Sequence, residues 1–104
     1  MATTAQTPAL SLFQAFADPY RIQVVELLRH QELCACDIAD RLNIAASKLS
    51  FHLKTLRKAG VIHGRQEGRW IYYRLNPSQL LVLEQYFSGF RHSGPAAAPR
   101  RCSD

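Results

Sequence analysis

Two cysteines separated by one residue, Cys34 and Cys36, are the part of this sequence with the clearest capacity for chemistry. The thiolate is the form of cysteine that binds soft metal ions and reacts with oxidants. The pair opens a helical pattern in which Ile38 and Leu42 lie four residues apart, and a helix N-terminus lowers the pKa of a thiol. Because residues two apart do not share a helix face, we expect one ion bound by both sulfurs to distort the first helical turn.

Helical patterns surround the cysteine pair. The spacing of apolar residues predicts a first helix over about 8–17, a second that begins after Asp18 and ends near residue 30, a short third after Leu33, and a fourth over about 46–59. Asp18 is followed by a proline, which is a helix-start signal, and Gly60 is placed to end the fourth helix in the left-handed conformation. The short loop around Asn43 makes the third and fourth helices a predicted helix-turn-helix.

The pattern changes from helix to strand after residue 60. Residues 61–65 and 69–75 are rich in β-branched and aromatic side chains and flank Glu67-Gly68, which predicts a tight β-hairpin. Asn76 and Gln79 then stand as in a capping box that opens a last helix. The predicted fold is mainly α with a β-hairpin wing, in the order α-α-α-α-β-β-α, which is a winged helix-turn-helix.

The fourth helix carries a candidate DNA-reading surface. If its leucines face the core, its other side exposes hydroxyl, basic and phenyl groups, which suit phosphates, base edges and thymine methyl groups. Basic and amide side chains at the hairpin tip are placed to reach the DNA backbone or the minor groove. His52 is assigned either a packing role or a phosphate contact. The predicted DNA-binding residues are Ser47, Lys48, Ser50, Phe51, His52, Lys54, Arg65, Gln66 and Arg69.

Composition agrees with a nucleic-acid partner. The 104-residue chain is 47% hydrophobic, which is enough for one packed domain, and its formal net charge of +5 favours polyanions. It shows no signal peptide and no apolar stretch long enough to span a membrane, so we expect a cytoplasmic protein with reduced thiols and no membrane partner. The predicted organisation is a flexible N-terminus (1–7), one DNA-binding and dimerisation domain (8–92), and a flexible tail (93–104).

The segments around the cysteines and in the fourth helix resemble the ArsR/SmtB family of metal-responsive repressors. The resemblance rests on Glu-Leu-Cys-Ala-Cys-Asp-Ile at 32–38 and on Leu-Ser-Phe-His-Leu-Lys-Thr-Leu-Arg-Lys-Ala-Gly-Val-Ile at 49–62. It implies a homodimer that occupies palindromic operator DNA without metal and releases the operator when metal binds. This chain departs from many members at Phe51, where arginine is common, at Ala45, where a capping serine is usual, and at Ala39, where some relatives hold a third cysteine.

The resemblance also bears on the inducer. Soft thiolates in this family favour trivalent arsenic or antimony, whereas zinc sensors use histidines in the last helix, and residues 75–91 contain none. Cadmium and lead sensors add cysteines in an N-terminal arm, and residues 1–33 contain none. Arsenite, with antimonite beside it, is therefore the predicted inducer at Cys34 and Cys36. A cadmium-, lead- or thiol-redox-responsive repressor on the same fold is the alternative.

A third sulfur and a second subunit complete the sequence-based hypothesis. Trivalent arsenic prefers three thiolates, and Cys102 is the remaining thiol, so it is a candidate third ligand; solvent or a small thiol is the alternative.

A thiol oxidoreductase is disfavoured, because no strand is predicted before Cys34 and no catalytic motif is present; we predict that the chain is not an enzyme. Apolar stripes on the terminal helices predict the dimer interface, with Leu12, Phe13, Phe16, Leu80, Leu83, Tyr86 and Phe87.

Overall fold

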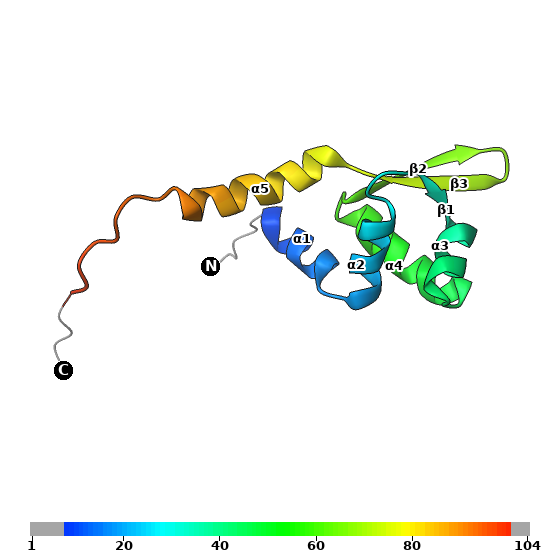
Figure 1. The fold of residues 1–104 in the computed structure, drawn as a ribbon, viewed down its shortest axis with the longest axis horizontal. Helices are drawn as coiled ribbons and strands as arrows, with labels where there is room; N and C mark the ends of the chain where they lie inside the picture. Colours follow the sequence, from blue (N-terminus) through cyan, green and yellow to red (C-terminus); the bar gives the residue numbers. More distant parts are fainter. Residues whose placement is uncertain (1–7, 101–104) are drawn as a thin grey trace, which may run out of the picture.

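The computed structural model describes residues 8–100, and the predicted N-terminal segment 1–7 and Cys102 lie outside the described residues. Helices dominate the fold, and a small sheet forms the wing at one end (Figure 1). The elements in chain order are α1 (Pro8–Phe16), α2 (Pro19–Leu27), β1 (Leu33–Cys34), α3 (Ala35–Leu42), α4 (Ala46–Lys58), β2 (Ile62–Glu67), β3 (Trp70–Leu75) and α5 (Pro77–Arg91). The predicted winged helix-turn-helix is confirmed, with one additional short strand. No helix in the described part of the chain is both long and apolar enough to cross a membrane.

Local capping explains where the helices begin and end. The Asp18 carboxylate accepts hydrogen bonds from the amides of Tyr20 (2.8 Å) and Arg21 (3.2 Å), which confirms the predicted start of α2. Asn43 adopts the left-handed conformation (φ 55°) and ends α3 before the turn into α4. Gly60 has φ +80°, as predicted for the residue that follows α4.

The wing is a three-stranded antiparallel sheet in the order β1-β3-β2. Glu67 pairs with Trp70, so the two-residue turn is Gly68-Arg69 rather than the predicted Glu67-Gly68, and Gly68 supplies the positive φ (64°) that tight hairpin turns require. Strand β1 was not predicted, since two residues carry no alternating pattern. It pairs with β3 and places Cys34 opposite Tyr72.

The core lies around the apolar face of α4. Leu49, Leu53 and Leu56 are at most 3% exposed, which confirms the predicted inward face of this helix. Side chains of α1, α2 and α3 and the chain entering the wing close over them: Leu12, Val24, Ile38 and Val61, all 0% exposed. Both helices of the helix-turn-helix are therefore positioned by one cluster of interdigitating side chains.

Helix α5 leaves the wing and runs past α1, and none of its residues is buried (Figure 1). Its start is joined to the end of α4. The Asn76 side chain accepts from the amide of Ser78 and donates to the Gly60 carbonyl (2.9 Å). Gln79 does not complete the predicted capping box, because its amide donates to the Ala59 carbonyl (3.0 Å). These bonds satisfy carbonyl groups that the end of α4 leaves free.

We expect Asn76→Ala to lower the free energy of unfolding by about 1 to 3 kcal/mol, because it removes a helix cap and leaves the Gly60 carbonyl without its partner. Urea denaturation followed by circular dichroism measures the change. Asn76→Asp keeps the capping acceptor and loses only the amide donor, so it should recover part of the loss. Equal stability of the parent and Asn76→Ala would contradict this account of the junction.

Candidate functional site: a thiol pair beside a DNA-reading helix

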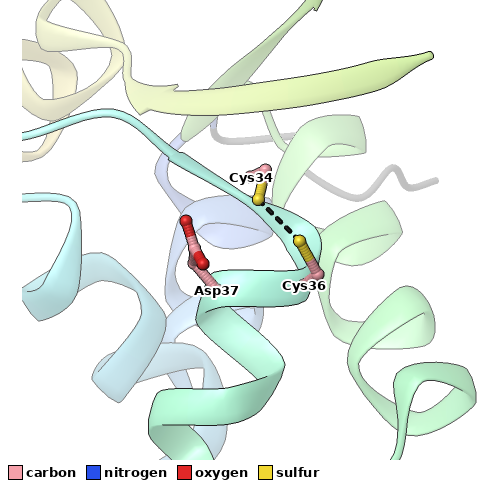
Figure 2. Close-up of side chains that lie close together, drawn as sticks. All are labelled: Cys34, Cys36 and Asp37. Carbon is pink, nitrogen blue, oxygen red and sulfur yellow. Dashed lines mark hydrogen bonds between the residues drawn. The ribbon is translucent and has the colours of Figure 1, made fainter.

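The two predicted metal-binding cysteines face each other where β1 passes into α3 (Figure 2). Their Sγ atoms are 2.8 Å apart, both thiols are free, Cys34 is buried and Cys36 is exposed. The pair is already assembled, because Cys34 belongs to the strand and only Cys36 to the first helical turn. The sulfurs thus lie close together without any change in the helix, and the expected distortion of the first helical turn by a bound ion stays a prediction.

A carboxylate completes the group of potential ligands. Asp37 follows Cys36 in the first turn of α3, and the three ligand atoms of Cys34, Cys36 and Asp37 lie within 4.8 Å of one another. Two sulfurs and one carboxylate oxygen fit a soft or borderline metal ion. The sequence analysis did not select Asp37, although an acidic residue next to the thiols in a first helical turn was a usable signal. Cys102, the proposed third sulfur, lies outside the residues described.

The environment of the pair raises the pKa of the Cys36 thiol above its ordinary value. The main cause is its hydrogen bond with the Cys34 sulfur; partial loss of solvation and the negative charges of Cys34 and Asp37 act in the same direction. The backbone amide of Asp37 lowers this pKa but does not outweigh the other effects. The prediction that the helix start lowers the thiol pKa is thus wrong for Cys36.

The thiol pair is connected to both predicted DNA-binding elements. Helix α3 packs on α4, and β1 pairs with β3 of the wing. Glu32, just before β1, accepts a 2.7 Å hydrogen bond from the Arg65 guanidinium, which also donates to Glu67 (3.0 Å). These carboxylates hold the pKa of Arg65 above its ordinary value. The segment around β1 is therefore joined to the wing by a backbone ladder and by an ion pair.

The exposed side of α4 presents most of the predicted DNA-reading set. Ser47, Lys48, Ser50, Phe51 and Lys54 all lie on this side and are exposed, and the Phe51 side chain is 62% exposed. The Lys48 ammonium group lies 4.3 Å from the centre of the Tyr20 ring, so α2 supports it from behind. The hydroxyl, cationic and aromatic groups of this side are therefore free to face a groove of DNA.

His52 differs from the rest of that set because it is only 5% exposed. Its Nδ1 atom lies 3.0 Å from the Arg21 guanidinium, which also donates to the Ala15 carbonyl (2.7 Å). A guanidinium has no acceptor, so Nδ1 accepts this bond and a neutral ring carries its proton on Nε2. His52 therefore ties α4 to α1 and α2, which corrects its place among the DNA-contacting residues in favour of packing. No local pattern around Arg21 indicated this contact.

The predicted DNA-binding residues of the wing differ in how many contacts their side chains make within the protein. Arg65 is held by two carboxylates and lies 5.2 Å from the Tyr72 ring centre. Gln66 donates to the Gly68 carbonyl within the turn. Arg69 is exposed at the turn itself. Of these three predicted contacts, Arg69 has the side chain least committed within the described part of the chain.

An uncovered apolar surface extends along α1 and α5. Phe13 packs edge-to-face on Tyr86 and Phe87, with ring centres 5.6 Å apart in both pairs. The predicted dimer interface needs a correction at Leu12, which is fully buried in the core, whereas Phe16 and Leu83 pack partly against that core. The large apolar side chains left exposed on the two helices are Leu10, Phe13, Leu81, Tyr86, Phe87 and Phe90.

A helix-turn-helix with polar and basic groups on its second helix, followed by a wing, defines a DNA-binding regulator of the winged helix-turn-helix class. The family model described as "Bacterial regulatory protein, arsR family" matches residues 18–63. A solved structure titled "possible transcriptional regulator for arsenical resistance" has a TM-score of 0.71 and 33% identity, covering 81% of this chain and 88% of that one.

Two relatives agree with this class. The chain is 40% identical over 72 residues to the arsenic resistance transcriptional regulator ArsR1 of Pseudomonas putida, in a match covering 68% of this chain. It is 33% identical over 87 residues to the cadmium resistance regulatory protein CadC of Listeria innocua, covering 82% of this chain and 73% of that protein. This chain belongs to the ArsR family of bacterial regulatory proteins.

The family and fold inferred from the sequence are thus confirmed, and the relatives are transcriptional regulators rather than enzymes, as predicted. The chain spans 56% of the length of the Pseudomonas protein. Its relatives include regulators named for arsenic and for cadmium, so membership of the family leaves the metal open.

The raised pKa of Cys36 has a measurable consequence. Only the thiolate is alkylated, so the rate of reaction of Cys36 with iodoacetamide should rise at a higher pH than for an ordinary thiol. Cys34→Ala removes the hydrogen bond and the neighbouring sulfur and should shift this profile to lower pH. Tandem mass spectrometry of the peptide that carries both cysteines measures alkylation of Cys36 separately from that of Cys34. Identical pH profiles with and without Cys34 would contradict the proposed cause.

The neighbours Phe51 and His52 should respond in opposite ways to substitution. His52→Ala leaves a partly buried Arg21 donor without its acceptor and should cost about 1 to 3 kcal/mol of stability, whereas His52→Asn, which restores an acceptor, should recover part of it. Phe51→Ala should change stability by no more than about 0.5 kcal/mol but weaken DNA binding several-fold. Urea denaturation and fluorescence anisotropy test the pair, and loss of stability in Phe51→Ala with none in His52→Ala would reverse the assignment.

Proposed function

We propose that this chain is a cytoplasmic, homodimeric repressor that binds operator DNA and releases it when arsenite, or antimonite, binds Cys34 and Cys36. The observation that carries the proposal is the preassembled thiol pair, with its sulfurs 2.8 Å apart, at the start of the helix that packs against the exposed DNA-reading helix. The fold and the arsenic-resistance regulator among the relatives support it.

The chemistry of arsenite suits a pair of thiols. Arsenous acid exchanges two of its hydroxyl groups for the two sulfurs, and each departing hydroxyl takes a thiol proton and leaves as water. Arsenic stays trivalent, and its third position holds the remaining hydroxyl, a small thiol or the sulfur of Cys102. A divalent ion brings no such proton acceptor, so its binding requires both thiols to release protons to the solvent.

Release of DNA follows from where the two sulfurs are attached. An arsenic atom bonded to both must fit between sulfurs that are now in contact, which displaces β1 relative to α3. Strand β1 is paired with the wing and α3 supports α4, so both DNA-binding elements are moved together. A coupling free energy of about 1 to 3 kcal/mol, typical of allosteric proteins, would weaken operator binding roughly 5- to 150-fold.

The DNA contacts and the dimer are assigned from exposed groups. The α4 side chains that we place in the major groove are Ser47, Lys48, Ser50, Phe51 and Lys54, with Arg65, Gln66 and Arg69 of the wing beside them. The apolar surface on α1 and α5 supplies the dimer interface, because none of the 15 residues of α5 is buried within one subunit and a second subunit would bury its exposed apolar side chains. In such a dimer the two reading helices face successive turns of a palindromic operator.

Cadmium or lead is the second candidate inducer. The Asp37 carboxylate within 4.8 Å of both sulfurs favours it, because cadmium and zinc sites accept an oxygen ligand beside thiolates. The short distance between the sulfurs also favours a thiol-redox version, in which peroxide takes two electrons and two protons from the pair to form a disulfide and two molecules of water.

Operator binding measured by fluorescence anisotropy, with arsenite, antimonite, cadmium and peroxide in parallel, tests these proposals. We expect arsenite to release the dimer from DNA, and Cys34→Ala or Cys36→Ala to abolish this release while DNA affinity stays at the parent value. Asp37→Asn should leave the arsenite midpoint unchanged, since the carboxylate is not required by a thiol-bound arsenic. Cys102→Ala shifts the midpoint only if that sulfur is the third ligand.

The outcomes separate the candidates. Release by cadmium but not arsenite, lost in Asp37→Asn, would replace the arsenite proposal with a divalent sensor. Release by peroxide alone, reversed by a reductant, would establish the redox version. Unchanged DNA affinity with every inducer would overturn the sensing proposal and leave a DNA-binding protein.

A further inference from the structure

The thiol pair forms part of the wall of an apolar groove. The groove has a volume of about 690 Å³ and lies between the start of α3, one side of α4 and strand β3. Its apolar walls include Ala39, Leu53, Trp70 and Ile71, and both Cys34 and Cys36 border the same space. A mainly apolar cavity of this size with a few polar groups is typical of a site for an organic ligand.

Trp70 and Ile71 make this groove unusual for a small protein surface. The Trp70 side chain is 49% exposed and that of Ile71 is 36% exposed, although both are large and apolar. Inorganic arsenite is a small polar molecule and gains nothing from such walls. The two side chains therefore indicate a ligand that joins an apolar part to a thiol-reactive centre.

We propose that the groove binds the organic substituent of an arylarsonous acid whose trivalent arsenic is held by Cys34 and Cys36. This inference rests on the proposed function and names the class of inducer. An arsenic atom with an aryl substituent has two exchangeable hydroxyl groups, which matches two thiols without a third ligand. Each hydroxyl leaves as water with one thiol proton, two arsenic–sulfur bonds form, the arsenic–carbon bond is kept, and no atom changes oxidation state.

The ring then lies where DNA contacts are predicted. Lys54 and Arg69, both assigned to the DNA-binding surface, also border the groove, as does Arg57 at the end of α4. An aryl group in the groove therefore occupies space directly beside the basic side chains that are predicted to reach DNA. A ligand in the groove and operator DNA therefore compete for the same surface. This competition adds to the effect of displacing β1.

The experiment uses Trp70, the one tryptophan of the chain, as a fluorescent reporter on the intact dimer. Phenylarsonous acid is compared with methylarsonous acid, because both form two arsenic–sulfur bonds and differ only in the organic group. Each affinity is divided by the affinity of the same compound for dithiothreitol, which removes the intrinsic reactivity. We expect phenyl to exceed methyl by about tenfold or more, since a ring buries more apolar surface.

Two matched variants assign that preference to the groove. Ile71→Gln makes the groove wall polar at similar size and should reduce the phenyl preference several-fold without changing the arsenite midpoint. Ile22→Gln is the same substitution at a 42% exposed isoleucine on α2, outside the groove, and should change neither. Cys34→Ser should abolish binding of all three arsenicals.

The outcomes distinguish this inference from the proposed function. Equal corrected affinities for phenyl and methyl, or the same loss of preference in Ile71→Gln and Ile22→Gln, would overturn the groove site while arsenite release of the operator stands. Failure of all arsenicals, arsenite included, to bind or to release DNA would overturn both. A phenyl preference that survives in Ile71→Gln would also exclude this groove as its source.

Discussion

Burial of one face of α4 is the constraint on which the rest of the structure depends. The core contains Leu49, Leu53 and Leu56. Their burial fixes the orientation of the helix about its own axis, so that its hydroxyl, cationic and phenyl groups point outward. The same leucines receive Ile38 of α3, whose first turn carries the second thiol. One packing arrangement therefore positions both the exposed surface of α4 and the thiol pair.

Polar contacts refine the orientation that packing sets. Arg21 joins three helices by donating to Ala15 and to His52, and side chains at the start of α5 donate to the carbonyls of the two residues that follow α4. Each bond satisfies a group that would otherwise be buried or partly buried without a partner, which is where hydrogen bonds contribute most. The described residues contain no buried side-chain nitrogen or oxygen left without a hydrogen bond.

Patterns local in the chain predicted most of the fold, because apolar spacing and caps at Asp18 and Asn76 act within a few residues. Contacts between distant segments account for what was missed. Strand β1 exists only through its pairing with β3. The sequence alone predicted an exposed His52, because its partner Arg21 belongs to another helix. The groove beside the thiols is formed by three separate segments, so no window of sequence contains its signal.

The junction between α4 and α5 lies at one end of a long helix, so a small rotation there would move the other end of α4 by a larger distance. Helix α4 has 13 residues, so its far end lies roughly 20 Å from the carbonyls that Asn76 and Gln79 hold. A rotation of about 10° at this junction moves that end by about 3.4 Å, the rise of one base pair. The two hydrogen bonds therefore add to the leucine packing in fixing the direction of a helix whose far end is sensitive to small rotations.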